Sequence, residues 1–541
     1  MPDTDDVSDC VDVDGHSEVI HPSTHQIAAL AIVVGQSEPA TSARRGRTDL
    51  RELIDSASKP FHRNAERTVF VAKPNGHQAS LERGLGLRFG KNGQMFDRGR
   101  IGELIAAERA RFELHHPRSQ ELASRAQNHL VSGVPMPWMT RWAGPFPLYV
   151  AEATGGRFRD VDGNDYVDFC LGDTGSMVGH SRPEVTEALI SQSRRGLTSM
   201  LPSSDAIVVA ENLTRRFGLP KWQFALSATD ANRFVLRFAR FLTGRSKIVV
   251  NDWCYHGTVD ETLVILDSDG RTISRPGAIG PQVDPSLTTR AVPFNDLDAL
   301  EAALRHGDVA CVLMEPALTN IGIVLPQDGY LRGVRQLAKK YGAFLVIDET
   351  HTICASPGGC TSAWGLEPDF VVIGKTIGGG VPVAAYGMTA AVAAALESKL
   401  DRESIDVGGV GGTLSGSSLA MAVMKATLTS SLLEEHFLKT IPLAESWAEG
   451  VSGVIAEKAL KWSVQQLGCR AEYWFSQAPI NGAQAAAMVD HELEEYFHLS
   501  ALNRGILLTP FHNMALMCPA HTMSDIDLHT DAFSEAVELL V

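Results

Sequence analysis

The sequence predicts an α/β protein in which helices cover both faces of a mostly parallel β-sheet, together with a smaller α+β domain. Short, fully apolar segments alternate with helix-like segments through the middle of the chain, which is typical of a parallel sheet buried on both faces. Hydrophobic residues make up 44% of the 541 residues, which is sufficient for a large core.

The predicted strands of the main sheet are, in chain order, "QFALSA", "KIVVND", "VACVLMEP", "AFLVIDE", "DFVVIGK" and "AAYGMT". Helix-like segments separate them, for example residues 328–342. Residues 148–169 predict two or three further strands, which are joined by Gly-Gly and Asp-Gly turns. Near the C-terminus, "GILLTP" predicts one strand among helices, and we assign it to the smaller domain.

We divide the chain into four segments. Residues 1–94 are acidic or polar and lack sustained periodicity, so we predict a disordered extension. An alternative is an upstream translation start, because the pattern of an amphipathic helix starts at Met95. Residues 95–180 supply the N-terminal helix and strands of the small domain, and residues 181–430 form the large domain. Residues 431–541 complete the small domain.

The composition argues against several kinds of partner. The formal net charge is −16, whereas proteins that bind nucleic acid carry basic patches, so we expect no nucleic-acid partner. The longest early apolar stretch, residues 27–35, is too short to cross a membrane, and no signal peptide is indicated. The eight cysteines form no CxxC pair, which is typical of reduced thiols in a cytoplasmic protein. We expect no metal ion, because His351 and Cys354 form only an isolated pair of candidate ligands.

Polar residues follow five of the predicted strands, at the edge where α/β sheets bind their ligands. They are Lys375, the pair Asp348-Glu349, the loop Ser227-Ala228-Thr229, the pair Tyr255-His256, and Glu315. Each has an ordinary explanation by itself: a surface lysine, a helix cap, a core aromatic ring, or a loop histidine with one backbone hydrogen bond, which is our expectation for His256. Their combination along one α/β segment favours a shared ligand.

Pyridoxal phosphate needs this combination of groups. A lysine whose charged form is disfavoured by burial or by neighbouring cations forms a Schiff base with the cofactor's aldehyde. An acid keeps the pyridine nitrogen protonated and makes the ring an electron sink. Small residues that open a helix present N–H groups to the phosphate, and an aromatic side chain stacks on the ring. We therefore predict pyridoxal 5'-phosphate as the cofactor.

These residues lie in stretches that resemble the class III (ornithine/GABA-type) pyridoxal-phosphate aminotransferases, and most of all the glutamate-1-semialdehyde aminomutase branch. The stretches include "DVDGNDYVDF", "ALSATDANRFVLRFAR", "CYHGT", "EPALTNIG", "FLVIDETHT", "PDFVVIGKTIGGGVPVAAYG" and "GGTLSGSSLAMA". The resemblance covers residues 120–541. It implies the fold-type I architecture, with a mixed sheet of seven strands in the large domain.

The resemblance implies a role for seven residues. Lys375 forms the Schiff base and carries the proton between the substrate's α-carbon and C4′ of the cofactor, and Asp348 pairs with the pyridinium nitrogen. The others are Tyr255 on the ring face, Ala228 and Thr229 at the phosphate, Asn320 at the phenolic oxygen, and Thr413 at the phosphate of the neighbouring subunit. Ala228 stands where the family has glycine, and it keeps a small residue there. Thr413 implies a homodimer with shared active sites.

Three departures from the family concern the substrate. Met139 stands where the aminomutase branch has an arginine that helps to hold the substrate carboxylate, and Arg141 lies two residues further on. Met514 stands at a glutamate of the family. Methionines favour an apolar, adaptable pocket. Asp173 stands at an aromatic position, where an acid either holds an amine or hydroxyl of the substrate or caps a turn.

These departures favour an intermolecular aminotransferase. It would move an amino group between an amine or amino acid of apolar character and an oxo acid or aldehyde, by a ping-pong mechanism. The physical reason is that a carboxylate loses its hydration without compensation in a site that lacks a partner cation. The first alternative is glutamate-1-semialdehyde 2,1-aminomutase, an isomerase. Further alternatives are racemisation or decarboxylation on the same cofactor, and an inactive scaffold, which the presence of Lys375 and Asp348 disfavours.

Overall fold

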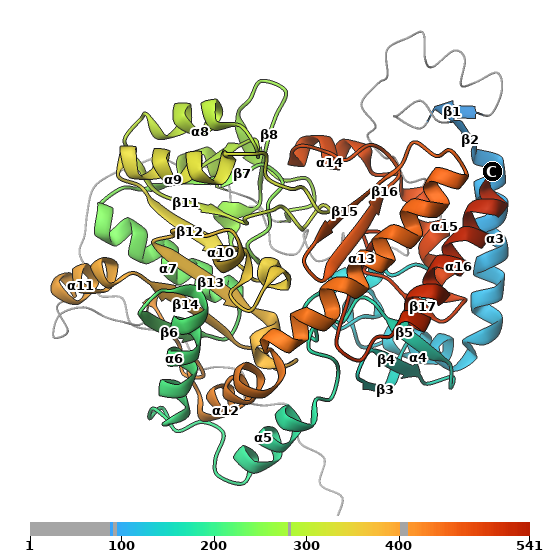
Figure 1. Ribbon diagram of the computed structural model, residues 1–541, viewed down its shortest axis with the longest axis horizontal. Coiled ribbons are helices and arrows are strands. Elements are labelled where there is room, and N and C mark those ends of the chain that lie inside the picture. Colours follow the sequence, from blue (N-terminus) through green and yellow to red (C-terminus); the bar gives the residue numbers. More distant parts are fainter. Residues whose placement is uncertain (1–86, 90–94, 280–282, 401–408) are drawn as a thin grey trace, which may run out of the picture. The chain divides into compact units, whose positions relative to one another are not determined.

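The computed structural model describes residues 87–89, 95–279, 283–400 and 409–541 (Figure 1). The extension predicted for residues 1–94 lies outside the described residues except for Leu87–Phe89 (β1), which pairs in antiparallel with Met95–Asp97 (β2). The helix predicted from Met95 begins instead at Arg98 and forms α3 (Arg98–His115). It begins there because the Asp97 carboxylate accepts hydrogen bonds from two N–H groups of the first turn.

A mixed sheet of seven strands forms the centre of the large domain, as the resemblance implies. Its strands are β6 (Lys221–Ala225), β7 (Lys247–Asn251), β10 (Thr289–Val292), β11 (Val309–Met314), β12 (Phe344–Asp348), β13 (Phe370–Gly374) and β14 (Ala384–Met388). Their order is β10-β7-β11-β12-β13-β14-β6. Strand β14 is antiparallel to β13 and β6, and the other pairs are parallel. Six strands match the predicted segments, whereas β10, at one edge, is not among them.

Burial on both faces explains why these strands are apolar. Every residue of β11 and β13 is buried. Helix α7 (Ala228–Thr243) packs against β6 and β11 to β14, while α8 (Leu297–Leu304) and α9 (Tyr330–Tyr341) pack against β7, β10 and β12. Helix α9 confirms the helix predicted at residues 328–342. Further helices are α4 (Pro117–Ala126), α5 (Pro183–Ser193), α6 (Asp205–Phe217), α10 (Gly359–Ala363), α11 (Ala390–Lys399) and α12 (Ser418–Ala426).

A second group of elements joins both ends of the described chain, and Figure 1 shows α3 (blue) alongside α15 and α16 (red). One sheet contains β3 (Val150–Thr154), β4 (Arg157–Asp160), β5 (Asp165–Asp168) and β17 (Ile506–Leu507), the last parallel to β5. Another contains β15 (Ser463–Leu467), β16 (Arg470–Trp474) and β18 (Met514–Leu516). The helices are α13 (Glu434–Glu457), α14 (Gly482–Met488), α15 (His491–Leu502) and α16 (Met523–Leu540). The domain limits at residues 180 and 430 stay predictions.

Three general properties bear on the expected membrane, redox and metal environment of the protein. Among the residues that the structure describes, no helix has both the length and the apolar character needed to cross a membrane. The seven described cysteines are free and buried. In the same residues, no group of three or more His, Cys, Asp or Glu side chains is arranged to hold a metal ion.

Candidate active site

Two adjacent strands end at the residues that the sequence singles out. Asp348, the last residue of β12, lies opposite Val372 of β13, and β13 ends two residues later at Gly374. Lys375 follows directly and begins a 3-10 helix that ends at Gly378. Strands β6, β7 and β11 run parallel to β12 and β13, so the loops after all five strands lie at one edge of the sheet.

Asp348 is a buried carboxylate that is fixed from several directions. Its Oδ2 accepts hydrogen bonds from Asn232 Nδ2 and His256 Nδ1, both at 2.9 Å, and its Oδ1 accepts one from the Thr350 N–H at 3.1 Å. Burial raises the pKa of this carboxyl, but the hydrogen bonds and the charge of His256 outweigh it and hold the pKa below its usual value. Asp348 therefore stays ionised although it is only 4% exposed.

The structure corrects the prediction for His256. Its ring is buried and bonds to the Asp348 carboxylate rather than to a backbone group. Burial lowers the pKa of the ring, but the Cys254 sulfur and the Asp348 carboxylate raise it well above its usual value. His256 and Asp348 thus form a buried ion pair. Sequence reasoning alone does not find this pair, because its members are 92 positions apart.

Lys375 lies in a different environment, charged on one side and open on the other. Its Nζ donates a hydrogen bond to Asp173 Oδ2 at 2.7 Å and lies 2.9 Å from His351 Nε2. Its side chain keeps 31% exposure, and its φ of +50° is a left-handed conformation that costs roughly 1–3 kcal/mol outside glycine. Burial raises the pKa of Asp173, but the charge of Lys375 outweighs this and lowers it. Asp173 is thus the counter-ion of Lys375 rather than a turn cap.

Two residues that the sequence analysis did not assign to the site complete this cluster. His351 lies next to Lys375, and Arg470 of β16, which is 1% exposed, reaches the cluster from the other group of elements. Thr174 Oγ1 lies 3.1 Å from His351 Nδ1 and accepts a hydrogen bond from the Arg470 guanidinium. Burial, followed by the charge of Lys375, lowers the pKa of His351 to about 3, so the ring is neutral.

The sequence holds a weak signal for these two residues. His351 is three positions after Asp348 in "DETHT", but a single loop histidine predicts no particular contact. Arg470 lies in "RAEYW", whose mixture of charged and aromatic residues does not resemble a buried strand, although all five residues are buried. Arg470 and Glu472, at alternate positions of this strand, are a weak local cue that does not identify their partners.

The predicted phosphate loop lies at the start of α7, close to two glycines. Ser227 caps the helix, because its hydroxyl accepts a hydrogen bond from a first-turn N–H at 3.2 Å. A Cβ atom at Gly257, where φ is +74°, would lie 2.0 Å from Thr229 Oγ1, and one at Gly374 would lie 3.1 Å from Ala228 Cβ. Glycine therefore allows the loops after β7 and β13 to approach the helix start, whose N–H groups suit a phosphate.

Three other predicted cofactor residues are less closely tied to Lys375. Tyr255 is half-buried after β7, and burial together with the charge of Asp173 raises its pKa. Asn320 follows β11, where a bridge joins it to Gly322. Thr413 is exposed in a turn before α12. Among the described residues, it is not part of the cluster around Lys375.

The two segments predicted to line the substrate pocket, around Met139 and around Met514, lie close together. Met139 and Arg141 lie in the 3-10 helix Pro137–Arg141, where Met139 is half-buried and Arg141 is exposed. The Arg141 guanidinium lies over the Phe511 ring, 5.2 Å from its centre. Phe511 is three positions before Met514, so the two segments predicted for the pocket are neighbours in space.

Met514 itself is buried, in β18. It lies opposite Glu472 of β16. The Glu472 carboxylate accepts a hydrogen bond from the Ile323 N–H, in the loop that also contains Asn320. This places a buried acid beside the position where the family has a glutamate, and the sequence analysis did not find it. The roles of all the predicted site residues stay predictions.

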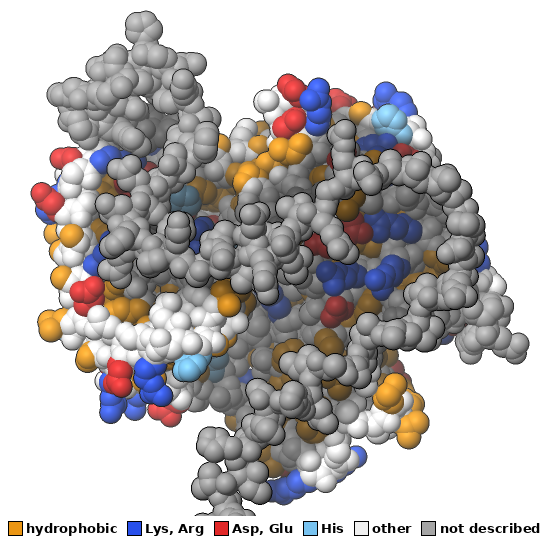
Figure 2. Space-filling model, turned by 180° about the vertical axis from the view of Figure 1, so that it is seen from behind, with side chains coloured by type: hydrophobic (Ala, Val, Ile, Leu, Met, Phe, Trp, Pro, Cys, Tyr) orange, Lys and Arg blue, Asp and Glu red, His pale blue; other side chains and the backbone are white. Residues whose placement is uncertain are grey.

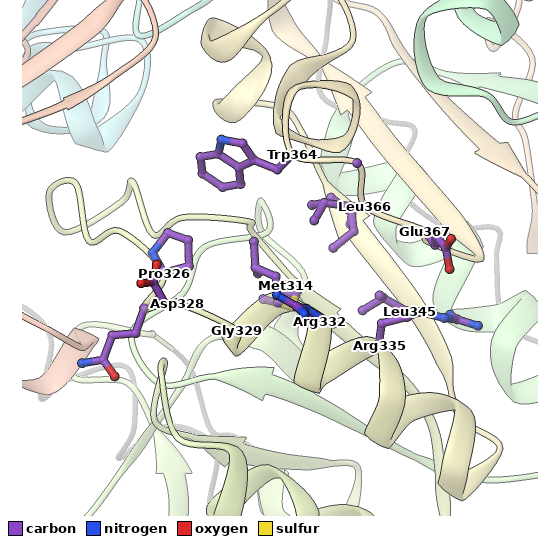
Figure 3. A pocket seen from close by; sticks show the side chains of 14 residues that line it. Met314, Pro326, Asp328, Gly329, Arg332, Arg335, Leu345, Trp364, Leu366 and Glu367 are labelled. Carbon is purple, nitrogen blue, oxygen red and sulfur yellow. The ribbon is translucent and has the colours of Figure 1, made fainter.

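A separate cavity of about 510 Å³ lies between the start of α9 and the loop that follows α10 (Figure 3). Met314 and Leu345 from the sheet and Trp364 from the loop contribute to its lining. One of its charged side chains, Arg335, is paired with Asp369 at 2.7 Å. None of the predicted site residues lines this cavity, so the carboxyl edge of the sheet is the better candidate for chemistry.

The residues at that edge fit pyridoxal phosphate. Asp348 offers a buried, ionised carboxylate to a pyridinium nitrogen, Lys375 offers an accessible amine to an aldehyde, and α7 offers N–H groups to a phosphate. Fold and site together define a pyridoxal-phosphate-dependent enzyme of fold type I. The sequence profile of the class III aminotransferase family matches residues 138–537 of the chain. The chain therefore belongs to this family.

Similar proteins support the family and its cofactor. A glutamate-1-semialdehyde 2,1-aminomutase from Anaeromyxobacter dehalogenans is 35% identical over 417 residues, which cover 75% of this chain and 95% of that protein. A crystal structure of a glutamate-1-semialdehyde aminomutase from Pseudomonas aeruginosa is 46% identical, with a TM-score of 0.80 over 82% of this chain and 100% of that one. A second structure of the Pseudomonas protein is in complex with PMP. A β-phenylalanine aminotransferase from Variovorax paradoxus is 26% identical, with a TM-score of 0.72 over 81% of this chain and 97% of that one.

The comparisons confirm the predicted fold, the enzyme class and the cofactor, pyridoxal phosphate. They favour the aminomutase alternative over the intermolecular aminotransferase, because the most similar of these proteins carry that name.

Proposed function

We propose that the chain moves an amino group between neighbouring carbons of one carboxylate-bearing substrate, as a glutamate-1-semialdehyde 2,1-aminomutase. The observation that carries this proposal is the pair of strand ends, Asp348 and Lys375, in a chain 35–46% identical to proteins of that name. The similarity spans 95% or more of those proteins.

Two arginines remove the main objection to a carboxylate substrate. The expectation of an apolar substrate depends on the missing arginine at Met139. Arg470, however, places a buried guanidinium in the Lys375 cluster, and Arg141 places an exposed one in the segment predicted to line the pocket. A positive charge nearby lowers the free energy of a bound carboxylate, so the site does not lack cations.

Each predicted residue has a definite task in this chemistry. Pyridoxal phosphate, when bound, supplies an aldehyde and an electron-accepting ring. With the cofactor bound, Lys375 Nζ would carry a proton between a carbon of the substrate and C4′ of the cofactor. Asp348, which His256 keeps ionised, balances the charge of the ring nitrogen. The remaining predicted contacts are Ala228 and Thr229 at the phosphate, Tyr255 on the ring and Asn320 at its phenolic oxygen.

An intermolecular aminotransferase is the second candidate, and it has one specific observation in its favour. Met139 and Met514 replace the two charged residues of the aminomutase branch, and Met514 is 1% exposed. A buried methionine accepts varied apolar groups. Such a pocket suits two different substrates in turn, an amino donor of apolar character and an oxo acid or aldehyde.

One assay separates the two candidates. The purified enzyme, loaded with the cofactor, is incubated with glutamate-1-semialdehyde alone, and 5-aminolevulinate is measured over time. The aminomutase forms it catalytically without a second amino donor or acceptor. The aminotransferase gives no such turnover, but converts amines only when an oxo acceptor is added. Absence of both activities would overturn the proposed class of reaction.

We also propose a homodimer that shares its active sites. Thr413 is exposed in the single chain, and so are several hydrophobic side chains of the segment between α5 and α6, such as Met200 at 77% and Leu201 at 71%. Hydrophobic side chains protrude from the lower part of the molecule in Figure 2, the part that holds α5 and α6 in Figure 1. A backbone hydrogen bond joins this segment, at Leu197, to Leu419 in the region of Thr413. Sedimentation at several concentrations tests the dimer.

We place the protein in the cytoplasm. The seven described cysteines are free, which suits a reducing compartment. Fractionation of the native host tests this, and recovery of the protein from outside the cytoplasm would contradict it.

A further inference from the structure

The Lys375 amine has two hydrogen-bond partners that can hold it in two protonation states. A protonated amine offers three N–H donors and a neutral amine offers two. The Asp173 carboxylate, at 2.7 Å, can only accept, and a ring nitrogen without hydrogen at His351 Nε2, at 2.9 Å, also accepts. One N–H for each partner is therefore available in both states of the amine.

The contact with Lys375 sets the tautomer of His351, and Thr174 can match it. Since Lys375 donates to Asp173 and is a donor toward His351, Nε2 carries no hydrogen and the ring proton lies on Nδ1. Thr174 Oγ1, 3.1 Å away, accepts from Nδ1–H. Arg470 has donors only, and it occupies the other lone pair of Thr174. Its guanidinium nitrogens are 3.5 Å from Nδ1, a longer distance than the one to Thr174.

The charges around His351 keep the ring neutral in this arrangement. Burial and the neighbouring charges of Lys375 and Arg470 disfavour the charged ring of His351. The carboxylates of Asp173 and Asp348 favour it, but less strongly, so the pKa of His351 falls to about 3. The ring therefore does not store a proton at neutral pH. It acts as a hydrogen-bond acceptor with a fixed orientation.

We propose that His351 is a positioning residue that, with Asp173, directs the lone pair of the neutral Lys375 amine toward the open side of the site. When two N–H groups point to Asp173 and His351, the lone pair occupies the remaining direction, and the Lys375 side chain keeps 31% exposure on that side. Thr174 supports this arrangement by accepting the ring hydrogen at Nδ1. The inference rests on the proposed role of Lys375 as the carrier of the substrate proton.

Three variants test the acceptor at position 351. His351→Leu removes it, His351→Gln restores a side-chain acceptor at similar reach, and Thr174→Val removes the partner of Nδ1–H. The matched control is His436→Leu, because His436 is also a buried histidine, and its ring nitrogens have no hydrogen-bond partner among the described residues. Thermal melting of each variant verifies that it folds.

The first measurement uses cofactor-free protein. A short pulse of acetic anhydride at several pH values labels neutral amines, and mass spectrometry reports the labelling of each lysine. Loss of an acceptor disfavours the charged amine, so at pH 7 we expect Lys375 labelling to rise by about 3- to 10-fold in His351→Leu and less in His351→Gln. The labelling of Lys425, which is paired with Asp205 at 2.7 Å, stays unchanged as an internal reference.

The second measurement uses the loaded enzyme and follows exchange of the substrate's transferable hydrogen with deuterated solvent. We expect His351→Leu to slow this exchange by about 10- to 100-fold with little change in KM, Thr174→Val to have a smaller effect, and His351→Gln to recover part of the loss. Wild-type labelling and exchange in His351→Leu, or equal losses in the leucine and glutamine variants, would overturn the inference. Exchange that persists in Lys375→Ala would instead overturn the proposed role of Lys375.

Discussion

Asp348 and Lys375 lie at the carboxyl ends of neighbouring strands, yet the protein holds them in opposite ways. The Asp348 side chain is almost fully enclosed, and hydrogen bonds fix both of its oxygens. Lys375 is partly exposed, has an unfavourable φ, and is held by one carboxylate and one ring nitrogen. The difference matches their tasks, because a charge that balances the cofactor stays in place whereas an amine that carries a proton changes partners.

The two sites also differ in where their partners come from. Asn232, His256 and Thr350, which bond to Asp348, lie in α7 and in the loops of the large sheet. The Lys375 cluster instead includes Asp173, 202 positions away in sequence, and reaches Arg470 on β16. A displacement of β16 would therefore change the surroundings of Lys375 and leave those of Asp348 unchanged.

The largest expected effect follows from removing the amine. Lys375→Ala should lose the covalent link to the cofactor and slow turnover by more than about 1,000-fold, because no other group replaces both the nucleophile and the proton carrier. Borohydride reduction followed by intact mass measurement detects the link. Lys340→Ala, which removes an exposed lysine paired with Glu301, is the control and should keep wild-type activity. A retained covalent link in Lys375→Ala would show that another lysine serves the site.

The next largest effect is expected at Asp348, the carboxylate that hydrogen bonds hold in place. Asp348→Asn leaves the buried charge of His256 without its counter-ion, which should lower the free energy of unfolding by about 3–5 kcal/mol and turnover by about 100-fold. Urea denaturation and steady-state kinetics measure both. Asp173→Asn, at a partly exposed pair, should cost at most about 1 kcal/mol of stability. Equal losses of stability in the two variants would contradict the distinction between an anchored and a movable group.

Sequence reasoning predicts the buried strands and their ends better than the side chains that surround Lys375. Strands such as β12 and β13 are uniformly apolar because both of their faces are buried, so their ends, with Asp348 and Lys375, follow from the local pattern. The edge strand β10 is not predicted, because four residues, "TRAV", carry too little pattern.

The partners of Lys375 depend on long-range contacts that no local pattern encodes. Arg470 lies in a strand whose burial comes from tertiary packing, and its hydrogen bond to Thr174 joins residues 296 positions apart. His351 carries a local signal only as a polar residue in a strand-end loop. The substrate prediction meets the same limit, since the absence of arginine at position 139 says nothing about a guanidinium that another strand supplies.

A smaller effect is expected at the phosphate loop. Gly257→Ala places a Cβ atom 2.0 Å from Thr229 Oγ1, and it also strains a φ of +74°. Gly270→Ala is a matched control, because Gly270 has the same φ but no atom within 4 Å of the added Cβ. We expect Gly257→Ala to weaken cofactor binding by about 10-fold and Gly270→Ala to leave it unchanged, as measured by titration of cofactor-free protein. Equal affinity in both variants would contradict a tight fit at α7.

The last expected effect, on stability rather than on activity or binding, contrasts His256, which has a buried counter-ion, with His529, which has none among the residues that the structure describes. His529 is 2% exposed against Trp447, and burial, followed by the charge of His498, lowers its pKa to about 3. Between pH 6.5 and 3 the unfolded state therefore binds more protons at this residue, so stability falls as the pH is lowered. At pH 5 this amounts to about 2 kcal/mol.

His529→Leu should remove that part of the acid sensitivity. Urea denaturation at pH 7.5 and pH 5 should show a stability difference about 2 kcal/mol smaller in His529→Leu than in the wild type. His306→Leu is the control, because His306 is exposed and should leave the difference unchanged. His256, whose pKa is raised, stays charged over this range and does not contribute in the same direction. An unaltered pH dependence in His529→Leu would mean that His529 takes up its proton in the folded state, so that burial without a partner does not keep a histidine neutral in this core.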